Sequence, residues 1–362
     1  MMSAAAQPRS DGWPDAAAEP LGKTFELSTH LIAREVLRRG YSVEWVNFTS
    51  FLTVLGGQEA GFWVTRCPLS NTFAERACTR KDVTAKLLRR GGLSVAEGKA
   101  FKRDEFDEAA AWARDLGVSV VKPVNGMKGR GLTVGVEDAA QFRAAWSDAL
   151  KVPRVPAIMV ERMHSGPEAR FVVVGGRCVA VGGKRPPYVV GDGRSTIREL
   201  VRAKNRQRRR SPHLRSRLIR MGEGRVARLQ RLGLGLDSVL DDGRELQLDT
   251  SGNISTGAES VDLTDEVHPS YLPIAEKAVA AMLGLGVGGV DIMSRDFSQP
   301  ADLSRYIVIE VNSHPGIGAH HFPLVGQPRD VAAAIVDHVI RELETGGDNS
   351  PSGSSGPRRR SR

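Results

Sequence analysis

The segment 306–311, YIVIEV, constrains the fold most, because an apolar strand here contains the acid Glu310 and ends at Asn312. Side chains of a strand alternate between its two faces, so Glu310 and Asn312 share one face. Asp291 likewise ends the apolar run at 287–290. Mg²⁺ prefers such oxygen ligands, and Mn²⁺ is an alternative ion. The pattern predicts a divalent metal site at the strand ends; the alternative is that both acids face solvent at a sheet rim.

The composition is typical of a globular chain with several lobes. The chain has 362 residues, of which 41% are hydrophobic and 26% charged, and such lengths usually divide into two or three lobes. No apolar stretch approaches the roughly 20 residues that cross a bilayer. Residues 1–20 lack the apolar segment of a signal peptide. The three cysteines have no C-x-x-C spacing, which argues against a disulfide framework or a zinc site. We expect a cytoplasmic protein with no membrane partner.

A glycine-rich loop, NGMKGRG at 125–131, separates two runs rich in β-branched residues. Glycines such as Gly126 and Gly129 let backbone N–H groups approach phosphate oxygens, and Lys122 adds a positive charge nearby. The spacing matches neither the P-loop nor the Rossmann fingerprint. The loop therefore predicts either a phosphate-binding element or a hairpin with a flexible tip.

The segment 157–174 predicts two strands joined by a Gly-Pro turn. Glu161 ends the first strand, and Glu168 and Arg170 begin the second. Such a hinge offers backbone groups to an adenine edge, and a carboxylate like that of Glu168 accepts hydrogen bonds from ribose hydroxyls. The alternative is an ordinary hairpin whose charged side chains face water.

Taken in order along the chain, these features resemble the ATP-grasp superfamily. The matching elements are Lys81, the Lys122 loop, the 161–168 turn, Asp291 and the E-x-N-x-x-P-G phrase at 310–316. Four phrases resemble, within it, the ATP-grasp portions of cyanophycin synthetase and bifunctional glutathione synthetase: PPYVVGDGRSTIRELV, LDSVLDDGRELQL, NISTGAESVDLTDEVHP and GVDIMSRD. The similarity covers about residues 65–342. Both of those enzymes carry an additional catalytic domain, so the comparison suggests a stand-alone amide ligase.

The resemblance implies a role for each matching position. For ATP these are Lys81, Lys122, Gly126, Gly129, Glu161, Met163 and Glu168; for Mg²⁺, Asp291, Glu310 and Asn312; for the phosphates and the acyl phosphate, Arg170 and Arg185; and for the substrates, Asn253, Ser255, Gly257 and His320. The two lysines are expected to reach the phosphates, the 161–163 hinge the adenine and Glu168 the ribose. His320 is expected beside the pocket of the acceptor amine.

The implied reaction joins a carboxylate of an amino acid or short peptide to an amine at the expense of ATP. The carboxylate attacks the γ-phosphate, and the amine then displaces phosphate from the acyl phosphate. Both partners of the first step are anionic, so Mg²⁺ and cationic side chains must neutralise the charge. An ATP-grasp enzyme that phosphorylates without amine ligation is an alternative.

The resemblance also implies an α/β (α+β) fold that holds the nucleotide between two α+β lobes. The expected ranges are a disordered N-terminus at 1–20, an N-terminal α/β lobe at 21–75, a first ATP-grasp lobe at 76–160, a C-terminal lobe at 161–344 with a basic insertion at 202–231, and a disordered basic tail at 345–362. Dimers are common in the superfamily, which leaves a homodimer as a further expectation.

The formal net charge is +9, and part of the excess lies in the 202–231 insertion. This stretch favours a solvated helical lobe, a site for a multiply anionic substrate such as an acidic peptide, or a nucleic-acid-binding module. No aromatic residues are interleaved for base stacking, so nucleic acid is the disfavoured partner. Gly289 also stands where D-alanine ligases have an arginine, which argues against that activity.

Overall fold

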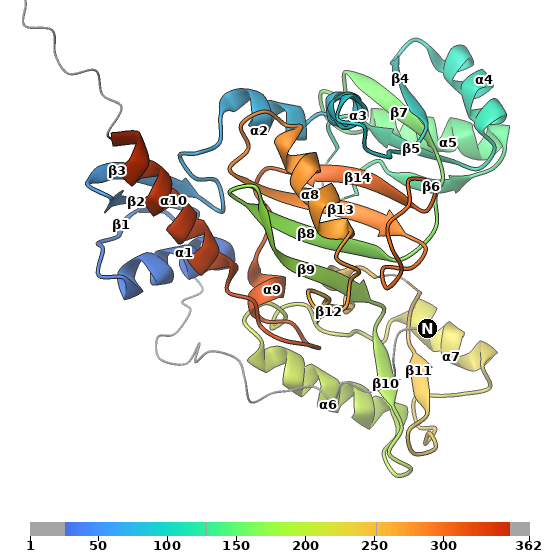
Figure 1. Cartoon of the computed structure of the whole chain (residues 1–362). Helices are drawn as coiled ribbons and strands as arrows, with labels where there is room; N and C mark the ends of the chain where they lie inside the picture. The colour runs from blue at the N-terminus through green and yellow to red at the C-terminus, as the bar shows by residue number, and fades with distance from the viewer. Residues whose placement is uncertain (1–25, 127–128, 251, 348–362) are drawn as a thin grey trace, which may run out of the picture.

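The structure is a computed structural model that describes residues 26–126, 129–250 and 252–347 (Figure 1). The predicted disordered segment 1–20 and residues 348–362 of the predicted tail lie outside the described residues. Residues 345–347, predicted to begin that tail, instead continue the last helix, and the Thr345 hydroxyl donates to the carbonyl of Arg341 at 2.9 Å in its final turn. None of the described helices is both long and apolar enough to cross a membrane.

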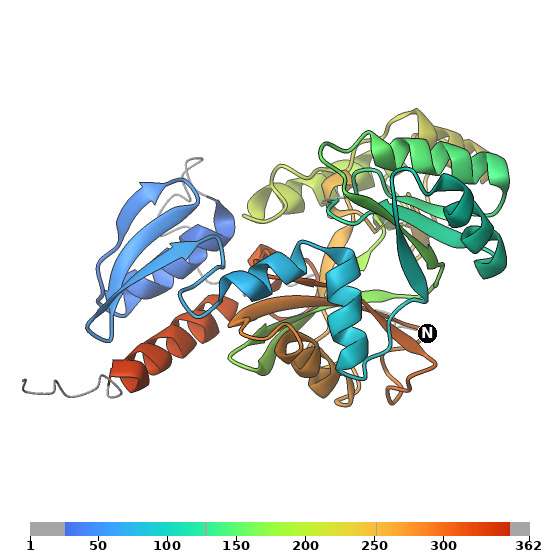
Figure 2. The same ribbon diagram turned by 90° about the horizontal axis from the view of Figure 1, so that it is seen from above.

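An N-terminal lobe forms one end of the molecule (Figure 2). One helix packs on a three-stranded antiparallel sheet of order β1-β2-β3, with bounds α1 (Leu27–Arg38), β1 (Glu44–Asn47), β2 (Ser50–Leu55) and β3 (Gln58–Trp63). The last helix, α10 (Val331–Gly347), completes the core of this lobe. The sequence indicated β1 and β3 but not β2, because Leu52 and Val54 put apolar side chains on the exposed face and remove the alternation.

A four-stranded antiparallel sheet forms a second lobe at the opposite end (Figure 2). Its order is β4-β7-β5-β6, with bounds β4 (Gly98–Lys102), β5 (Ser119–Pro123), β6 (Thr133–Val136) and β7 (Ala157–Arg162). The helices α4 (Phe106–Leu116) and α5 (Ala139–Leu150) cover it, α4 through Ala109 and Leu116 and α5 through Phe142 and Trp146. The Gly-rich loop joins β5 to β6, and its residues 127–128 lie outside the described residues.

A five-stranded antiparallel sheet lies between these lobes. Its order is β12-β9-β8-β13-β14, with bounds β8 (Glu168–Val174), β9 (Arg177–Arg185), β12 (Glu259–Asp262), β13 (Val287–Ser294) and β14 (Tyr306–Asn312). The helices that share its larger core are α2 (Thr72–Cys78), α3 (Lys81–Arg90) and α8 (Tyr271–Ala280). Residues 81–90 were assigned to the first ATP-grasp lobe from the sequence; Leu88 packs in the core of the five-stranded sheet, and Ala85 packs with Val124 and Met159 of the four-stranded lobe.

Strand β8 divides the core of this sheet by simple alternation. Ala169, Phe171 and Val173 point into the cluster that contains α8 and α3. Val172 and Val174 point to the other face, into the cluster that α1 and α10 complete. Arg170 belongs to this second face but lies beyond its apolar cover, so the face changes from apolar to polar along one strand.

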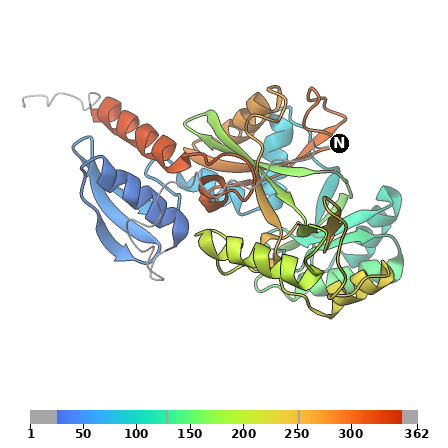
Figure 3. The ribbon, with the colours of Figure 1, turned by 90° about the horizontal axis from the view of Figure 1, so that it is seen from below.

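Residues 188–247, which contain the predicted basic insertion 202–231, fold into a small lobe, here called the insertion lobe, at the β12 edge of the five-stranded sheet (Figures 1 and 3). Its elements are β10 (Tyr188–Val190), β11 (Glu245–Gln247), α6 (Ile197–Arg210) and α7 (Glu223–Arg231). Thr196 and Glu199 form a capping box at the start of α6. The lobe has a core of its own, which includes Val201, Leu229 and Leu240. The insertion is therefore a packed unit.

We predict that Leu88→Ala destabilises the whole protein, because the side chain is 1% exposed in the core of the five-stranded sheet. The expected loss in the free energy of unfolding is about 2–5 kcal/mol. The control is Leu303→Ala, where the side chain is 63% exposed. Urea denaturation followed by far-UV circular dichroism measures both variants. Equal midpoints for the two variants would contradict the packing of α3 against this sheet.

Candidate active site

A row of aligned residues crosses four strands of the five-stranded sheet. Gly182 of β9 pairs with Arg170 of β8, Arg170 with Asp291 of β13, and Asp291 with Glu310 of β14. Residues that are directly opposite in antiparallel strands have side chains on the same face. The sequence prediction that Asp291, Glu310 and Asn312 lie close together therefore agrees with the strand register, and Arg170 joins them.

The charges of Arg170 and Asp291 form a bidentate ion pair. The Arg170 Nε lies 2.6 Å from Oδ1 of Asp291, and Nη2 lies 2.5 Å from Oδ2. Burial alone raises the pKa of Asp291, whose side chain is 5% exposed, but the guanidinium outweighs it and lowers the pKa below its usual value. The arginine therefore keeps this buried carboxylate ionised.

Glu310 has a different environment. Burial, followed by the nearby charge of Asp291, raises its pKa. The Asn312 amide nitrogen lies 3.0 Å from Oε1 of Glu310 and 3.5 Å from Oδ2 of Asp291. The Lys81 Nζ lies 3.9 Å from Oε2 of Glu310 and donates to the carbonyl of Gly126 at 2.7 Å. Lys81 thus links the aligned residues Arg170, Asp291 and Glu310, here called the polar row, to the start of the Gly-rich loop.

This donor set fits a hard divalent cation. Two carboxylates and one carboxamide converge, and a half-turn of the Asn312 amide exchanges its nitrogen and oxygen. Mg²⁺ is usually held by one or two carboxylates together with water and substrate phosphates. Among the described residues no group of three or more His, Cys, Asp or Glu side chains could hold a metal ion.

The four-stranded lobe contributes a second ion pair. The Lys122 Nζ on β5 lies 2.5 Å from Oε2 of Glu161 on β7, and their side chains are 9% and 12% exposed. The backbone N–H of Met163 donates to the carbonyl of Val118 at 2.9 Å, so this donor is used within the lobe. On the five-stranded sheet, the Glu168 carboxylate accepts a hydrogen bond from Nζ of Lys184 at 2.8 Å. Lys122, Glu161, Met163 and Glu168, which were predicted to bind ATP, thus already form ion pairs or hydrogen bonds within the protein.

Other predicted residues lie away from the polar row. Arg185 pairs with Glu245 at 2.5 Å, and its guanidinium carbon lies 3.8 Å from the centre of the Tyr188 ring. Asn253 precedes the short 3₁₀ helix η1 (Ile254–Thr256) and accepts from the N–H of Ser255. Gly257 ends η1 with φ of 108°, a conformation that suits glycine. Arg185 therefore lies where the five-stranded sheet meets the insertion lobe, and residues 253–257 form part of the wall of that lobe.

His320 lies at the other end of the row, in α9 (Gly318–His321). Its ring lies over Gly182, where an added Cβ would come within 2.9 Å of the His320 Cε1. Burial, followed by the charge of Arg170, lowers the pKa of His320 to about 4. The imidazole is therefore neutral near neutral pH.

Two residues that the site requires were not among the predicted site residues. Gly182 leaves the space that the ring of His320 fills. Gly289 faces Pro315, and an added Cβ would lie 2.7 Å from the Pro315 Cβ and 3.7 Å from the Arg170 Cδ. The signal in the sequence is a glycine pair inside a buried strand, at 182–183 and at 288–289. A larger residue at either position would displace the polar row.

Comparison with known proteins places this arrangement in a class. No family model matches the chain. Cyanophycin synthetase of Trichormus variabilis is 31% identical over 351 residues, which cover 94% of this chain and 37% of that protein. The glutathione biosynthesis bifunctional protein of Mannheimia succiniciproducens is 33% identical over 329 residues, covering 88% of this chain and 43% of that protein. A crystal structure of a bifunctional glutathione synthetase from Pasteurella multocida matches with a TM-score of 0.71 and 30% identity over 88% of this chain and 44% of that chain.

The chain has the ATP-grasp fold, as the sequence predicted. It is related, more particularly, to the cyanophycin synthetases and the bifunctional glutathione synthetases, and the predicted resemblance is confirmed. The chain spans less than half the length of each relative named above.

We predict that His320 makes stability depend on pH. Its pKa is about 4 in the folded protein, against an ordinary value of 6.5. Above pH 6.5 the ring is neutral in both the folded and the unfolded chain, and full stability is present. As the pH falls from 6.5 toward 4, the unfolded chain binds the proton first, so the free energy of unfolding decreases. The full effect is of the order of 3 kcal/mol. His320→Gln should flatten the fall in the free energy of unfolding between these pH values, measured by urea titrations at several pH values. Parallel profiles for wild type and variant would refute the prediction.

Proposed function

We propose that this protein is an ATP-dependent ligase that joins the carboxylate of an amino acid or short peptide to an amine. The reaction passes through an acyl phosphate and releases ADP and phosphate. The observation that carries the proposal is the aligned row of Arg170, Asp291 and Glu310, which Lys81 links to the Gly-rich loop. The relationship to cyanophycin synthetase and bifunctional glutathione synthetase supports the same class of reaction.

The proposed ATP site lies between the four-stranded and five-stranded sheets. Lys81 and Lys122 neutralise phosphate charge, and the Gly-rich loop with Gly126 and Gly129 covers the phosphates. For Lys122 this means exchanging Glu161, its present partner at 2.5 Å, for an anionic phosphate oxygen. Glu168 accepts from the ribose, and the hinge around Met163 borders the adenine.

Asp291, Glu310 and Asn312 hold Mg²⁺ in this proposal, with Mn²⁺ as the alternative ion. The ion supplies charge neutralisation for the phosphoryl group that is transferred. Arg170 keeps Asp291 ionised and in place through its two hydrogen bonds to the carboxylate. Burial, followed by the charge of Asp291, raises the pKa of Glu310, and a bound cation would relieve the repulsion between these two carboxylates.

The substrates approach from the β9 and β12 side of the sheet. Asn253, Ser255 and Gly257 border the carboxylate substrate, and His320 borders the amine. Arg185 lies outside the polar row, at the end of β9 toward the insertion lobe, and in this proposal its charge acts on the acyl phosphate from that side. We also propose a cytoplasmic location and a homodimer; the cysteines Cys67, Cys78 and Cys178 are free thiols, as a reducing compartment requires.

We predict that Glu310→Gln lowers amine-dependent ADP formation about a hundredfold or more, because the proposed metal site loses a negative charge. The control is Glu59→Gln on the exposed surface of β3, which should keep full activity. A coupled assay for ADP, run with pairs of amino acids and dipeptides and followed by product mass, measures the rate. Full activity of Glu310→Gln would sink the assignment. ADP formation that never depends on an amine would favour a kinase-type reaction.

A second prediction concerns nucleotide affinity. Lys122→Met should weaken ATP binding about tenfold or more, since a buried lysine near the phosphates is lost. Because this variant leaves Glu161 buried without its partner, the double variant Lys122→Met with Glu161→Gln tests the same loss in a neutral site. Lys151→Met, an exposed lysine of the same lobe, is the matched control. Isothermal titration with ATP and Mg²⁺ measures all four proteins; unchanged affinity in the double variant would exclude Lys122 from the ATP site.

A further inference from the structure

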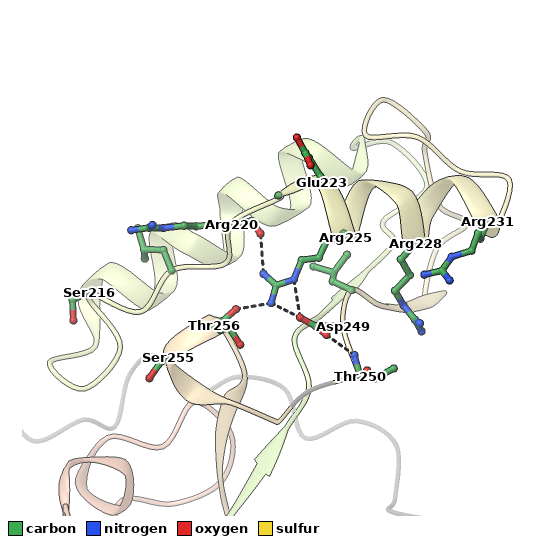
Figure 4. Close-up of a pocket in the computed structure, with 14 residues that line it drawn as sticks. Ser216, Arg220, Glu223, Arg225, Arg228, Arg231, Asp249, Thr250, Ser255 and Thr256 are labelled. Carbon is green, nitrogen blue, oxygen red and sulfur yellow. Dashed lines mark hydrogen bonds and ion pairs between the residues drawn. The ribbon is translucent and has the colours of Figure 1, made fainter. Parts of the chain in front are cut away.

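The insertion lobe contains a pocket of about 680 Å³ that the proposed reaction leaves without a role (Figure 4). This volume lies within the usual range for ligand sites, about 300–1,000 Å³. Its wall includes Arg220, Arg225, Arg228 and Arg231 from the segment around α7. All four arginines between residues 220 and 231 therefore line one concavity.

Arg225 forms the fixed part of the wall. Its Nη2 donates to Oδ2 of Asp249 at 2.8 Å and to the carbonyl of Thr256 at 2.6 Å, and its Nη1 donates to the carbonyl of Arg220 at 2.9 Å. The side chain is largely buried, and its charge is matched by Asp249. Arg225 thus ties η1 and the end of β11 to the start of α7 and gives the pocket a defined shape.

The other three arginines keep their charge available. Within the described residues, Arg220, Arg228 and Arg231 form no ion pair, and Arg228 has one contact, from Nε to the Gln247 carbonyl at 3.2 Å. Figure 4 places Arg220 at one end of the pocket and Arg231 at the other, both away from the Asp249 carboxylate. Glu223 is the one further acid of the wall, so the pocket carries a surplus of positive charge.

The backbone at the start of α7 adds to this preference. Gly222 precedes the helix without a side-chain cap, and neither Gly222 nor Gly224 has a neighbouring atom within 4 Å of the position of a Cβ. Both glycines line the pocket. The first N–H groups of a helix attract anions, and here they open onto the same space as the three arginines.

The pocket shares two wall residues with the element proposed to border the carboxylate substrate. Ser255 and Thr256 line it, and Ser255 belongs to the N-x-S-T-G element expected near the carboxylate substrate. From the adjoining Gly257 the chain enters β12, whose Glu259 pairs with Arg185 of β9. A ligand in the pocket therefore borders the strand pair that leads to the polar row.

We propose that this pocket binds the additional carboxylates of a peptide substrate that carries several acidic side chains. The inference rests on the proposed ligase function, which needs a carboxylate substrate, and it specifies that substrate as a multiply anionic peptide. Three arginines spread along one concavity match carboxylates spaced along an extended chain. No aromatic residue lines the pocket, so the stacking platform typical of single-stranded nucleic acid is absent from its described wall.

The test measures binding without ATP, so that it does not depend on ligase activity. Fluorescein-labelled tetraglutamate and tetraalanine are titrated with the full chain, and fluorescence anisotropy gives each Kd. The pocket variant is Arg220→Glu with Arg231→Glu. The matched control is Arg206→Glu with Arg209→Glu, which makes the same charge change on exposed arginines of α6 outside the pocket.

We expect tetraglutamate to bind more tightly than tetraalanine, and its Kd to rise at least about tenfold in the pocket variant but less than about twofold in the control. If the charge-reversed variant does not fold by circular dichroism, Arg220→Ala with Arg231→Ala replaces it with the same expected order of affinities. Equal losses in pocket and control variants, or equal affinity for the two peptides, would overturn the proposal.

Two further arms separate this inference from its alternatives. A single-stranded DNA 12-mer that binds more tightly than tetraglutamate and is lost in the same pocket variant would make the pocket a nucleic-acid site and overturn the proposal. Glu310→Gln should bind tetraglutamate as wild type does, because the acid lies outside the pocket wall. Retained ligase activity in Glu310→Gln would reject the proposed function, whereas a pocket variant that binds like wild type rejects only this inference.

Discussion

The ion pair between Arg170 and Asp291 is the interaction on which the polar end of the sheet depends. Two charges are removed from water here, and a buried pair is stable only when geometry and hydrogen bonds are good. Both conditions hold, since two N–H groups of the arginine reach both carboxylate oxygens. Loss of one partner from a buried pair typically costs about 3–5 kcal/mol. The strands that hold the pair must therefore stay in register.

That register in turn depends on small residues beside the pair. Gly182 and Gly289 leave room for the ring of His320 and for Pro315, each of which would lie under 3 Å from an added Cβ. The ring and the proline occupy the face between the apolar cover of the N-terminal lobe and the charged row. They separate the polar row from the apolar core that α10 completes, and this favours a low local dielectric around the Arg170–Asp291 pair.

Sequence reasoning found the strands whose polar ends interrupt an apolar run. Asp291 and Glu310 were recognisable because an acid rarely stands inside such a run, and their proximity follows from the antiparallel pairing of β13 with β14. It missed β4, where Lys99 and Lys102 hide the alternation, and it did not show that α3 packs against both lobes, through Leu88 and Ala85. The helix pattern of α3 gives its apolar face but not its partner, because any apolar surface satisfies that face.

The roles of individual side chains were the hardest to predict, since a role depends on partners that are distant in sequence. Arg185 illustrates this: its neighbours Glu245 and Tyr188 come together only when β10 pairs with β11. The convergence of the arginines around α7 was equally hidden, because a run of charges predicts a solvated face as readily as a pocket. The hydrogen bonds from Arg225 to Asp249 and Thr256, seen only in the structure, are what hold the arginine-rich segment 220–231 around a cavity.

The junction between this lobe and the sheet explains how the two sites stay in a fixed relation. Lys204 of α6 pairs with the buried Glu259 of β12, and its Nζ lies 3.4 Å from the centre of the Tyr188 ring. Burial, followed by the charge of Glu259, raises the pKa of Tyr188 to about 12, so its hydroxyl stays neutral. Lys204 therefore joins three elements, α6, β10 and β12, through one desolvated charge. Glu259 is fixed to the five-stranded sheet because its strand, β12, pairs with β9. A tilt of the insertion lobe would therefore break the buried ion pair between Lys204 and Glu259. The proposed peptide pocket is thus anchored to the sheet that carries the polar row.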